Sequence, residues 1–399
     1  MANEHPVVPG FRFAGVASGI KPEGALDLAL MMSDAACPAA AVFTRNRVKA
    51  APVLLASERI ELGRAQAVLV NSGTANACTG PDGMDAARTT TEALAGQLRI
   101  DDSLVLPAST GIIGKLLPAD KVVAAIPRLV EDLSADGVER FARAIMTTDQ
   151  WPKIASVQFA AGRGDPATVL GIAKGAGMVH PDMATTLGFV ATDLPMTTVF
   201  LQESLRHAVD RTFNCLSVDG ETSTNDTLVA MASGKVDTPP LKGSAREART
   251  FADALADVLG ELAKSIARDG EGAQHLVRVE VVGAPSDATA RQVARRIASS
   301  LLVKTAIHGC DPNWGRIVAA SGTAGVVFKT EDVDIRVGDI PLVRKGVAVG
   351  GRADEEARKV MQGPEYTITV ALGTSSGKGH YWTCDLGPAY VQLNAGHRT

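Results

Sequence analysis

The stretch Lys174-Gly-Ala-Gly-Met-Val-His-Pro-Asp-Met-Ala-Thr-Thr-Leu-Gly-Phe-Val-Ala-Thr-Asp193 decides the fold, because it leads a glycine-rich loop into an apolar run. Two glycines and a proline mark the part between Gly175 and Pro181 as a loop. The run from Leu187 to Ala191 predicts a short buried strand. Thr185 precedes it, and a threonine can act as a nucleophile when a base such as its own free α-amino group activates it. The pattern alone favours the simpler interpretation of Thr185 as a strand residue whose hydroxyl binds backbone.

The composition indicates a globular protein with a reduced interior. The chain has 399 residues, 46% of them hydrophobic, which suffices for one large or two ordinary domains. A net charge of −4 with interspersed signs gives no indication of a nucleic-acid or membrane surface. We expect no transmembrane helix and, from Met1–Pro6, no signal peptide. The five scattered cysteines lack C-x-x-C spacing, which predicts reduced thiols and a cytoplasmic location.

The hydrophobic pattern predicts strands and helices that mix without strict βαβ alternation. A layered α+β sandwich therefore fits better than a doubly wound Rossmann sheet. Polar loops at 71–83 and 109–114 each follow a strand and precede a helix, which places them at the mouth of a sheet, where ligands commonly bind. The strands are expected over 26–31, 41–44 (after a polar turn at 33–38), 67–70, 104–106, 154–159, 169–173, 187–191, 276–282, 333–337, 366–372 and 381–384, and the helices over 84–98, 119–133, 203–213, 244–267 (with a Ser244–Glu247 capping box) and 287–302.

Further motifs extend along the chain in the order found in one known family. They are Asn71–Gly80, Ser109–Gly114, Met146–Asp149, Ser217–Thr227, Asp269–Ala273, Val303–Ala306, Asp311–Arg316 and Leu393–Ala395. With Lys174–Phe189, they make nearly the whole chain similar to the ornithine acetyltransferase (glutamate N-acetyltransferase) family, a bifunctional and self-cleaving family of arginine biosynthesis. The resemblance implies a helix/sheet/sheet/helix sandwich of the N-terminal-nucleophile-like kind. It also implies a cut between Ala184 and Thr185, which divides the chain into fragments 1–184 and 185–399.

The resemblance also implies the residues of the site. Thr185 matches the nucleophile, and Thr110 and Gly111 match the oxyanion-hole pair. The matching substrate contacts are Thr148 (with Thr147 as its near alternative), Lys174, Thr185, Glu271, Asn394 and Thr399. A lysine is a natural partner for an α-carboxylate, and Glu271 could pair with the ammonium group of ornithine. Without the resemblance, Ser109-Thr-Gly111 is a helix cap, and Lys174 and Glu271 are solvated loop charges.

The implied substrates are N2-acetylornithine and glutamate, and acetyl-CoA stays open as a co-substrate. The two fragments are expected to assemble into a heterotetramer or a larger complex, with no nucleic-acid or membrane partner. Seven scattered histidines without an H-E-x-x-H pattern argue against a zinc site, and we expect no metal and no cofactor. Departures from the family pattern at Thr74, Thr186 and Gln274-His275 leave the substrate range open.

Three alternatives stay open at this stage. One is a relative of the family from a secondary pathway, and another is a self-processing amide hydrolase or aminopeptidase of similar fold. The third is a non-catalytic binding protein, which an uncut chain would support. The roles of Asn71–Gly80 and Asp311–Arg316 are not assigned by the sequence. Asp219, Asn225 and Asp226 are candidates for holding the nucleophile strand by hydrogen bonds, and equally for turn formation.

Overall fold

The long strand β2 (Leu28–Phe43) organises the first body of the computed structural model, which describes residues 5–161, 166–180, 186–243 and 246–396. Its first half pairs with β1 and β3, and its second half pairs with β9. The prediction of two strands separated by a turn at 33–38 is wrong. A register shift between Met32 and Cys37 absorbs the polar residues as a bulge, so the chain stays extended and bends.

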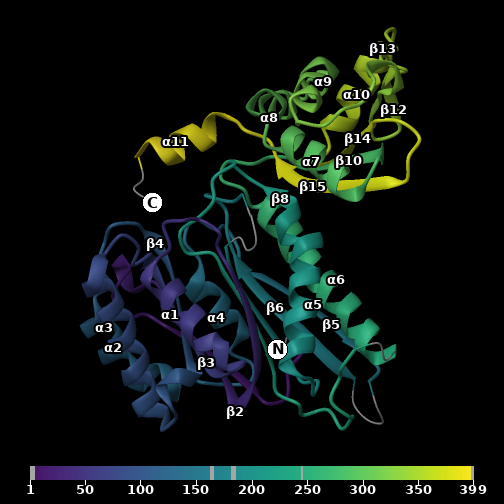
Figure 1. Ribbon diagram of the computed structural model, residues 1–399. Helices are drawn as coiled ribbons and strands as arrows, with labels where there is room; N and C mark the ends of the chain where they lie inside the picture. The colour runs from purple at the N-terminus through teal and green to yellow at the C-terminus, as the bar shows by residue number, and fades with distance from the viewer. Residues whose placement is uncertain (1–4, 162–165, 181–185, 244–245, 397–399) are drawn as a thin grey trace.

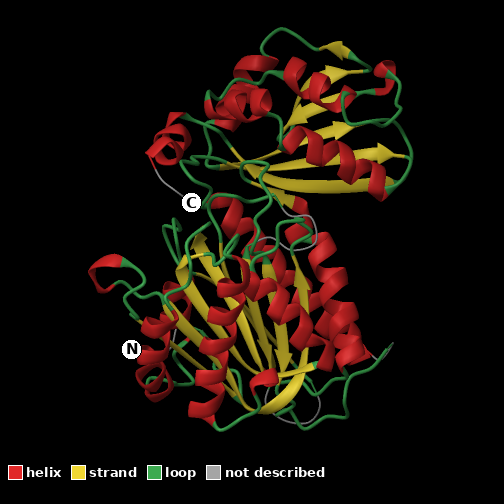
Figure 2. Ribbon diagram, turned by 60° about the vertical axis from the view of Figure 1, so that its left-hand side comes forward, coloured by secondary structure: helices red, strands yellow, loops and turns green. Residues whose placement is uncertain are grey.

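The bend divides the strands of the first body into two facing layers (Figure 2). Successive side chains of β2 alternate between two hydrophobic cores. Leu28 and Leu30 of β2 pack under helices α2 and α3, whereas Ala29 and Met31 face the layer formed by β6, β7 and β9. The far side of that second layer packs on α5 and α6. The order is helix, sheet, sheet, helix, which confirms the expected layered α+β sandwich. The strands are β1 Phe11–Val16, β3 Arg64–Thr74, β4 Val105–Ile112, β5 Lys153–Phe159, β6 Ala167–Lys174, β7 Leu187–Thr192 and β9 Thr227–Ala232.

Strand β7 is the buried strand that the opening stretch predicts. All of its residues are buried, and it lies between β6, which is antiparallel to it, and β9, which is parallel. The expected hairpin of β5 and β6 is also confirmed. Because β6 precedes Thr185 in the chain and β7 follows it, the sheet joins segments from both sides of the predicted cut.

The helices of the first body agree with the sequence in most places. They are α1 Ala51–Arg59, α2 Gly80–Leu98, α3 Ala119–Glu131, α4 Val138–Ile145, α5 Thr198–Arg211 and α6 Arg246–Arg268, of which α1 and α4 were not predicted. The capping residue Ser244 lies outside the described residues. The loops predicted at 71–83 and 109–114 start too early, because β3 continues to Thr74 and β4 to Ile112.

The second body is a seven-stranded mixed sheet with one face covered by helices (Figure 1). Its strand order is β13-β12-β11-β14-β10-β15-β8. The single helix predicted over 287–302 is two helices, since the chain turns at Ser299 and Ser300. The elements are β8 Leu216–Ser217, β10 Leu276–Ala284, α7 Asp287–Ala298, α8 Leu301–His308, α9 Trp314–Gly322, β11 Asp334–Val337, β12 Ile340–Arg344, β13 Val347–Ala348, α10 Ala353–Met361, β14 Glu365–Ala371, β15 Gly377–Cys384 and α11 Pro388–Gly396.

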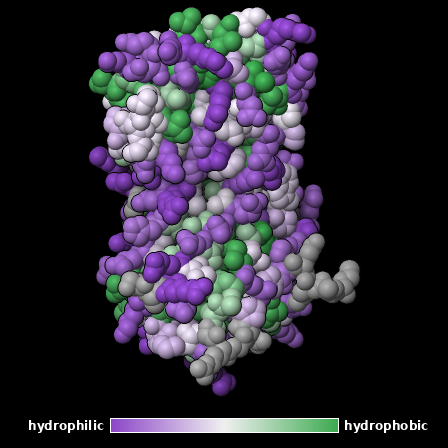
Figure 3. All heavy atoms as spheres, turned by 90° about the vertical axis from the view of Figure 1, so that its right-hand side faces the viewer, coloured by the Kyte–Doolittle hydropathy of each residue, from purple (hydrophilic) through white to green (hydrophobic). Residues whose placement is uncertain are grey.

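Helix α11 projects from the side of the second body and lies above the first body in both ribbon views (Figures 1 and 2). It thereby brings the C-terminal part of the chain close to the ends of the strands of the first body. On the face drawn in Figure 3, hydrophilic residues cover both bodies, with hydrophobic residues in scattered groups between them. Within the part of the chain that the structure describes, no helix is both long and apolar enough to cross a membrane.

Candidate active site

A cavity of about 720 Å³ lies beside α11, where β3, β4 and β6 end. Every predicted site residue that the structure describes lines this cavity: Thr110, Gly111, Thr148, Lys174, Glu271 and Asn394. The predicted residues Ala184, Thr185 and Thr399 lie outside the described residues. Thr186, which directly follows the predicted nucleophile, also lines the cavity. Residues from distant parts of the sequence thus converge on one place.

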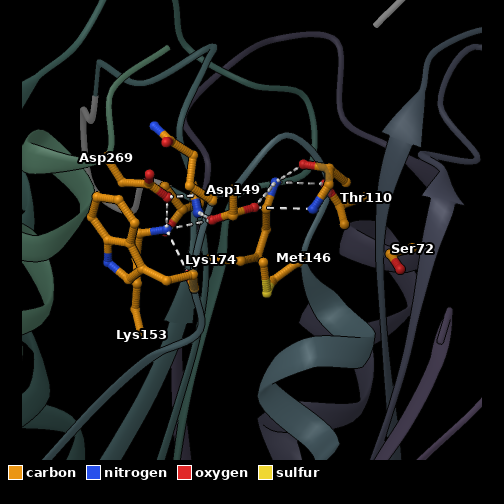
Figure 4. Close-up of polar contacts among 12 residues, drawn as sticks. Ser72, Thr110, Met146, Asp149, Lys153, Lys174 and Asp269 are labelled. Carbon is orange, nitrogen blue, oxygen red and sulfur yellow. Dashed lines mark hydrogen bonds and ion pairs between the residues drawn. The ribbon is translucent and has the colours of Figure 1, made fainter. Parts of the chain in front are cut away.

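Lys174 is the last residue of β6 and not a solvated loop charge. Its side chain is buried, and its Nζ donates to Thr147 Oγ1 at 2.7 Å and to Thr110 Oγ1 at 3.3 Å (Figure 4). Burial lowers the pKa of Lys174, and the negative charge of Asp149 partly offsets that effect. The lysine therefore connects the predicted oxyanion residue with the segment that carries the predicted substrate contact Thr148.

Lys174 lies next to a buried network of ion pairs, 4.0 Å from Asp149. Lys153 Nζ lies 2.7 Å from Asp149 Oδ1 and 2.6 Å from Asp269 Oδ2, and none of the three side chains is exposed (Figure 4). Asp149 also accepts the backbone N–H groups of Gly175 at 2.6 Å and Thr147 at 3.0 Å. Burial raises the pKa of Asp149, but the two lysines outweigh it and bring the pKa to about 2. The ionised carboxylate therefore fixes the backbone on both sides of the Lys174–Thr147 contact.

The sequence reasoning missed this network. Asp149 ends the Met146–Asp149 motif, Lys153 follows it by four residues, and Asp269 begins the Asp269–Ala273 motif. That spacing and those motif positions are the signal that could have suggested a link.

Thr110 and Gly111 lie at the end of β4, close against β3. Gly111 has φ +127°, and a Cβ at this position would lie 2.4 Å from the carbonyl carbon of Gly73, so only glycine fits. Asn225 Nδ2 donates to Ser109 O at 2.8 Å and to Ala75 O at 2.7 Å. The alternative of a helix cap is wrong, because Thr110 belongs to a strand and α3 begins at Ala119. Asn225 joins the ends of β3 and β4, so its role extends beyond a local turn.

Part of the cavity lining is acidic. Glu271 Oε2 accepts a hydrogen bond from Asn394 Nδ2 at 2.7 Å, so α11 is tied to the end of α6. Asp219 and Tyr390 also belong to the lining, with the Tyr390 hydroxyl 3.5 Å from Asp219 Oδ2. Burial raises the pKa of the Asp219 carboxyl. The cavity lining therefore includes both lysines and carboxyl groups, which suits ligands that carry both charges.

Two aspartates hold the chain on either side of residues 181–185. Asp219 accepts the N–H groups of Met178 at 2.6 Å and Val179 at 2.9 Å. Asp226 Oδ1 accepts the N–H of Thr186 at 2.8 Å. The expectation that these aspartates hold the nucleophile strand is confirmed for Asp226, since Thr186 N belongs to the peptide bond that follows Thr185.

The second carboxyl oxygen of Asp226 can accept a further hydrogen bond. Among the described residues, Asp226 Oδ2 and Thr186 Oγ1 are buried and have no hydrogen-bond partner. Burial raises the pKa of Asp226 well above its usual range. Thr186 itself has φ +72°, which is uncommon for a β-branched residue and marks a constrained backbone. Thr186, with its unpartnered hydroxyl and constrained backbone, directly follows the predicted nucleophile in the sequence.

The described residues contain no group of three or more His, Cys, Asp or Glu side chains that could hold a metal ion. The contacts of the cavity are hydroxyl groups, ammonium groups, carboxyl groups and backbone. These are the groups that bind a small zwitterionic molecule and move protons and acyl groups.

The layered sandwich, together with a cavity lined by Thr110, Gly111 and Lys174, agrees with an acyl-transfer enzyme of the N-terminal-nucleophile-like class. The comparisons with known proteins specify the class further. The chain belongs to the ArgJ family, whose model matches residues 12–399.

Close relatives cover the whole chain. The arginine biosynthesis bifunctional protein ArgJ of Syntrophotalea carbinolica is 46% identical over 392 residues, which are 98% of this chain and 99% of that protein. The protein of the same name from Geobacter sulfurreducens is also 46% identical, over 98% of this chain and 100% of its own length. A crystal structure of the arginine biosynthesis bifunctional protein ArgJ from Bacillus halodurans shares 42% identity with a TM-score of 0.51, and the match covers 52% of this chain and 98% of that chain.

Proposed function

We propose that this chain is an acetyltransferase that moves the acetyl group from N2-acetylornithine to glutamate through an acetyl ester of Thr185. The observation that carries the proposal is the convergence of Thr110, Lys174 and Glu271, from three separate elements, on one cavity. The relatives, which are named as bifunctional proteins of arginine biosynthesis, support the same activity. They favour it over a secondary-pathway enzyme and over an amide hydrolase or aminopeptidase.

In this proposal the chain first cuts itself between Ala184 and Thr185. The Thr185 hydroxyl oxygen attacks the Ala184 carbonyl carbon, the C–N bond breaks, and the resulting ester is hydrolysed by water. The products are a carboxylate on fragment 1–184 and a free α-amino group on fragment 185–399. Hydrogen bonds from Met178 N to Asp219 and from Thr186 N to Asp226 support this step. They hold the chain on both sides of residues 181–185 before the cut.

The sheet supports the association of the two fragments after the cut. Strand β7, from the second fragment, is hydrogen-bonded to β6 from the first, and its side chains lie in the cores on both faces of its layer. The solved Bacillus halodurans chain, which is about half as long as this one, agrees with a family of cut proteins.

The acyl transfer then uses the new α-amino group as the base. Its pKa is about 7.7–8.0 in a free chain, so it accepts the proton of the Thr185 hydroxyl near neutral pH. The oxygen attacks the acetyl carbonyl, and Thr110 Oγ1 and the Gly111 N–H stabilise the oxyanion. Because Thr110 Oγ1 accepts from Lys174, its own O–H is free to donate to that oxyanion. The C–N bond breaks, ornithine leaves with the proton, and the glutamate amine attacks the ester in the reverse sequence.

The lysine and carboxyl side chains of the cavity support the choice of substrates. Lys174 suits the α-carboxylate that both substrates carry, and Glu271 suits the ammonium group of the ornithine side chain. Asn394 holds Glu271 in place at 2.7 Å. Contacts of Thr148 and Thr399 with the substrate belong to the proposal as well.

The proposal includes a location and an assembly. We propose that the two fragments form a heterotetramer or a larger complex in the cytoplasm, without a metal or a cofactor. The five free cysteines support a reducing compartment. Acetyl-CoA is a second donor to test, with the bifunctional name of the relatives as its support.

The test separates the donors and acceptors. The purified protein is incubated with N2-acetylornithine alone, with N2-acetylornithine plus glutamate, and with acetyl-CoA plus glutamate. Acetylglutamate and ornithine are measured by mass spectrometry. Acetylglutamate in the second reaction supports the transferase, whereas rapid ornithine release that is independent of glutamate would indicate a hydrolase.

A further inference from the structure

We propose that Lys21 forms a subsite for the side-chain carboxylate of the acyl acceptor, an inference that rests on the proposed function. The donor N2-acetylornithine and the acceptor glutamate share an α-carboxylate, and each carries on its α-carbon the nitrogen that holds or receives the acetyl group. They differ in the charge at the end of the side chain. A cavity that uses both therefore needs a positive partner for the acceptor as well as a negative partner for ornithine. Lys21 lines the cavity and was not among the predicted site residues.

The backbone that carries Lys21 is held by a buried carboxylate. Asp27 is completely buried, and its two oxygens accept the N–H of Ser18 at 2.6 Å, the N–H of Ile20 at 2.7 Å and the N–H of Lys21 at 2.9 Å. The Ser18 hydroxyl adds a fourth bond at 2.8 Å. Four donors on one buried side chain leave this segment little freedom. The position of Lys21 is therefore set before any ligand binds.

The side chain of Lys21 is also directed by the fold. Its Nζ donates to Met146 O at 2.6 Å and to Leu26 O at 3.1 Å. A Cβ at Gly73 would lie 3.2 Å from Lys21 Cγ, so glycine at this point of β3 gives the lysine room. Within the described part of the chain, no acceptor is found for the third N–H bond of the ammonium group. That bond is available for a ligand in the cavity.

Lys21 and Lys174 act as two separate positive charges in the cavity. Lys174, which the proposed function assigns to the α-carboxylate, contacts Thr147 and Thr110 and has Asp149 at 4.0 Å. Lys21 reaches the same segment at the carbonyl of Met146, one residue before Thr147. Two ammonium groups next to one segment match the two carboxylates of glutamate. They match glutamine less well, because glutamine has one carboxylate and a neutral amide.

Titration of Lys21 provides a second readout. Burial lowers the pKa of Lys21 to about 8, with Asp27 and Asp149 raising it and Lys174 lowering it. The ammonium group is charged below that pH and loses its charge as the pH rises through it. The preference for glutamate over glutamine should therefore decline above about pH 8 in the wild type.

The experiment compares glutamate with glutamine as acceptor, with N2-acetylornithine as donor. The variants are Lys21→Met, Lys21→Arg and the matched control Lys121→Met. Lys121 does not line the cavity, but its Nζ donates to Gly19 O at 2.7 Å and so supports the same segment. The measured quantity is kcat/KM for each acetylated acceptor.

We expect Lys21→Met to lower kcat/KM for glutamate roughly 10- to 100-fold, the effect of losing one charge-assisted hydrogen bond, with a much smaller change for glutamine. Lys21→Arg should restore part of the preference and keep it above pH 8, and Lys121→Met should retain the wild-type ratio. An equal loss for both acceptors in Lys21→Met, or the same collapse in Lys121→Met, would overturn the subsite. Absence of ornithine release from the wild type would overturn the proposed function itself, and the two failures are thus distinguishable.

Discussion

Replacing Lys153 with methionine should destabilise the first body strongly, because it leaves two buried carboxyl groups without their shared cation. The Lys153 ammonium group lies within 2.7 Å of both Asp149 and Asp269, and all three side chains have no exposed area. Asp149 keeps two backbone N–H donors and Lys174 at 4.0 Å, whereas among the described residues Asp269 keeps the Gln150 N–H alone. Removing one partner of a buried ion pair costs about 3–5 kcal/mol, and we expect a loss of that size.

The assay is urea denaturation followed by tryptophan fluorescence. Trp151 reports on the network directly, since Lys153 Nζ lies 5.8 Å from the centre of its ring. The matched control is Lys264→Met, which removes a partly exposed lysine that pairs with Glu365 at 3.0 Å and lies over Trp382. The control should lose less than about 1 kcal/mol. Equal losses in Lys153→Met and Lys264→Met would refute the reasoning.

Three further predictions concern the cavity. Thr110→Ala should slow acetyl transfer roughly 10²–10³-fold, the effect of losing one oxyanion donor, and wild-type rates of ornithine release would exclude that role. Asp226→Ala should slow the appearance of fragment 185–399 on gels, because the Thr186 N–H loses its acceptor; unchanged cleavage would show that this bond is not needed. Lys174→Met and Glu271→Gln should each weaken acetylornithine use by about 1.5–3 kcal/mol in kcat/KM, and unaltered kinetics in both would remove them from the substrate site.

Much of the fold could be predicted because its signals are local. The apolar run of β7 and the periodicity of α6 both lie where the sequence placed them. The single strand β2 could not be predicted, since a polar segment with a proline ordinarily forms a turn, whereas here the pairing of both neighbours keeps it extended. The break between α7 and α8 was missed for a similar reason, because the apolar pattern continues across it.

For the site, the sequence indicated some of the residues but not the contacts that hold them. The resemblance pointed to Thr110, Lys174 and Glu271, and the structure brings them to one cavity. Contacts between distant segments, such as Lys153 with Asp269 and Lys21 with Met146, carry no periodic signal. A lysine at the start of a strand is usually exposed. Lys153 is buried between Asp149 and Asp269 because the assembled fold brings these segments together.

The most direct test of the account is the mass of the C-terminal fragment after brief exposure to N2-acetylornithine without an acceptor. The account predicts a purified protein in two pieces, 1–184 and 185–399. The second piece should gain the mass of one acetyl group on Thr185 and lose it when glutamate is added. Thr185→Ala should give one uncut chain without acetyl incorporation. An intact wild-type chain with full activity, or an acetyl group on any residue other than Thr185, would contradict the account.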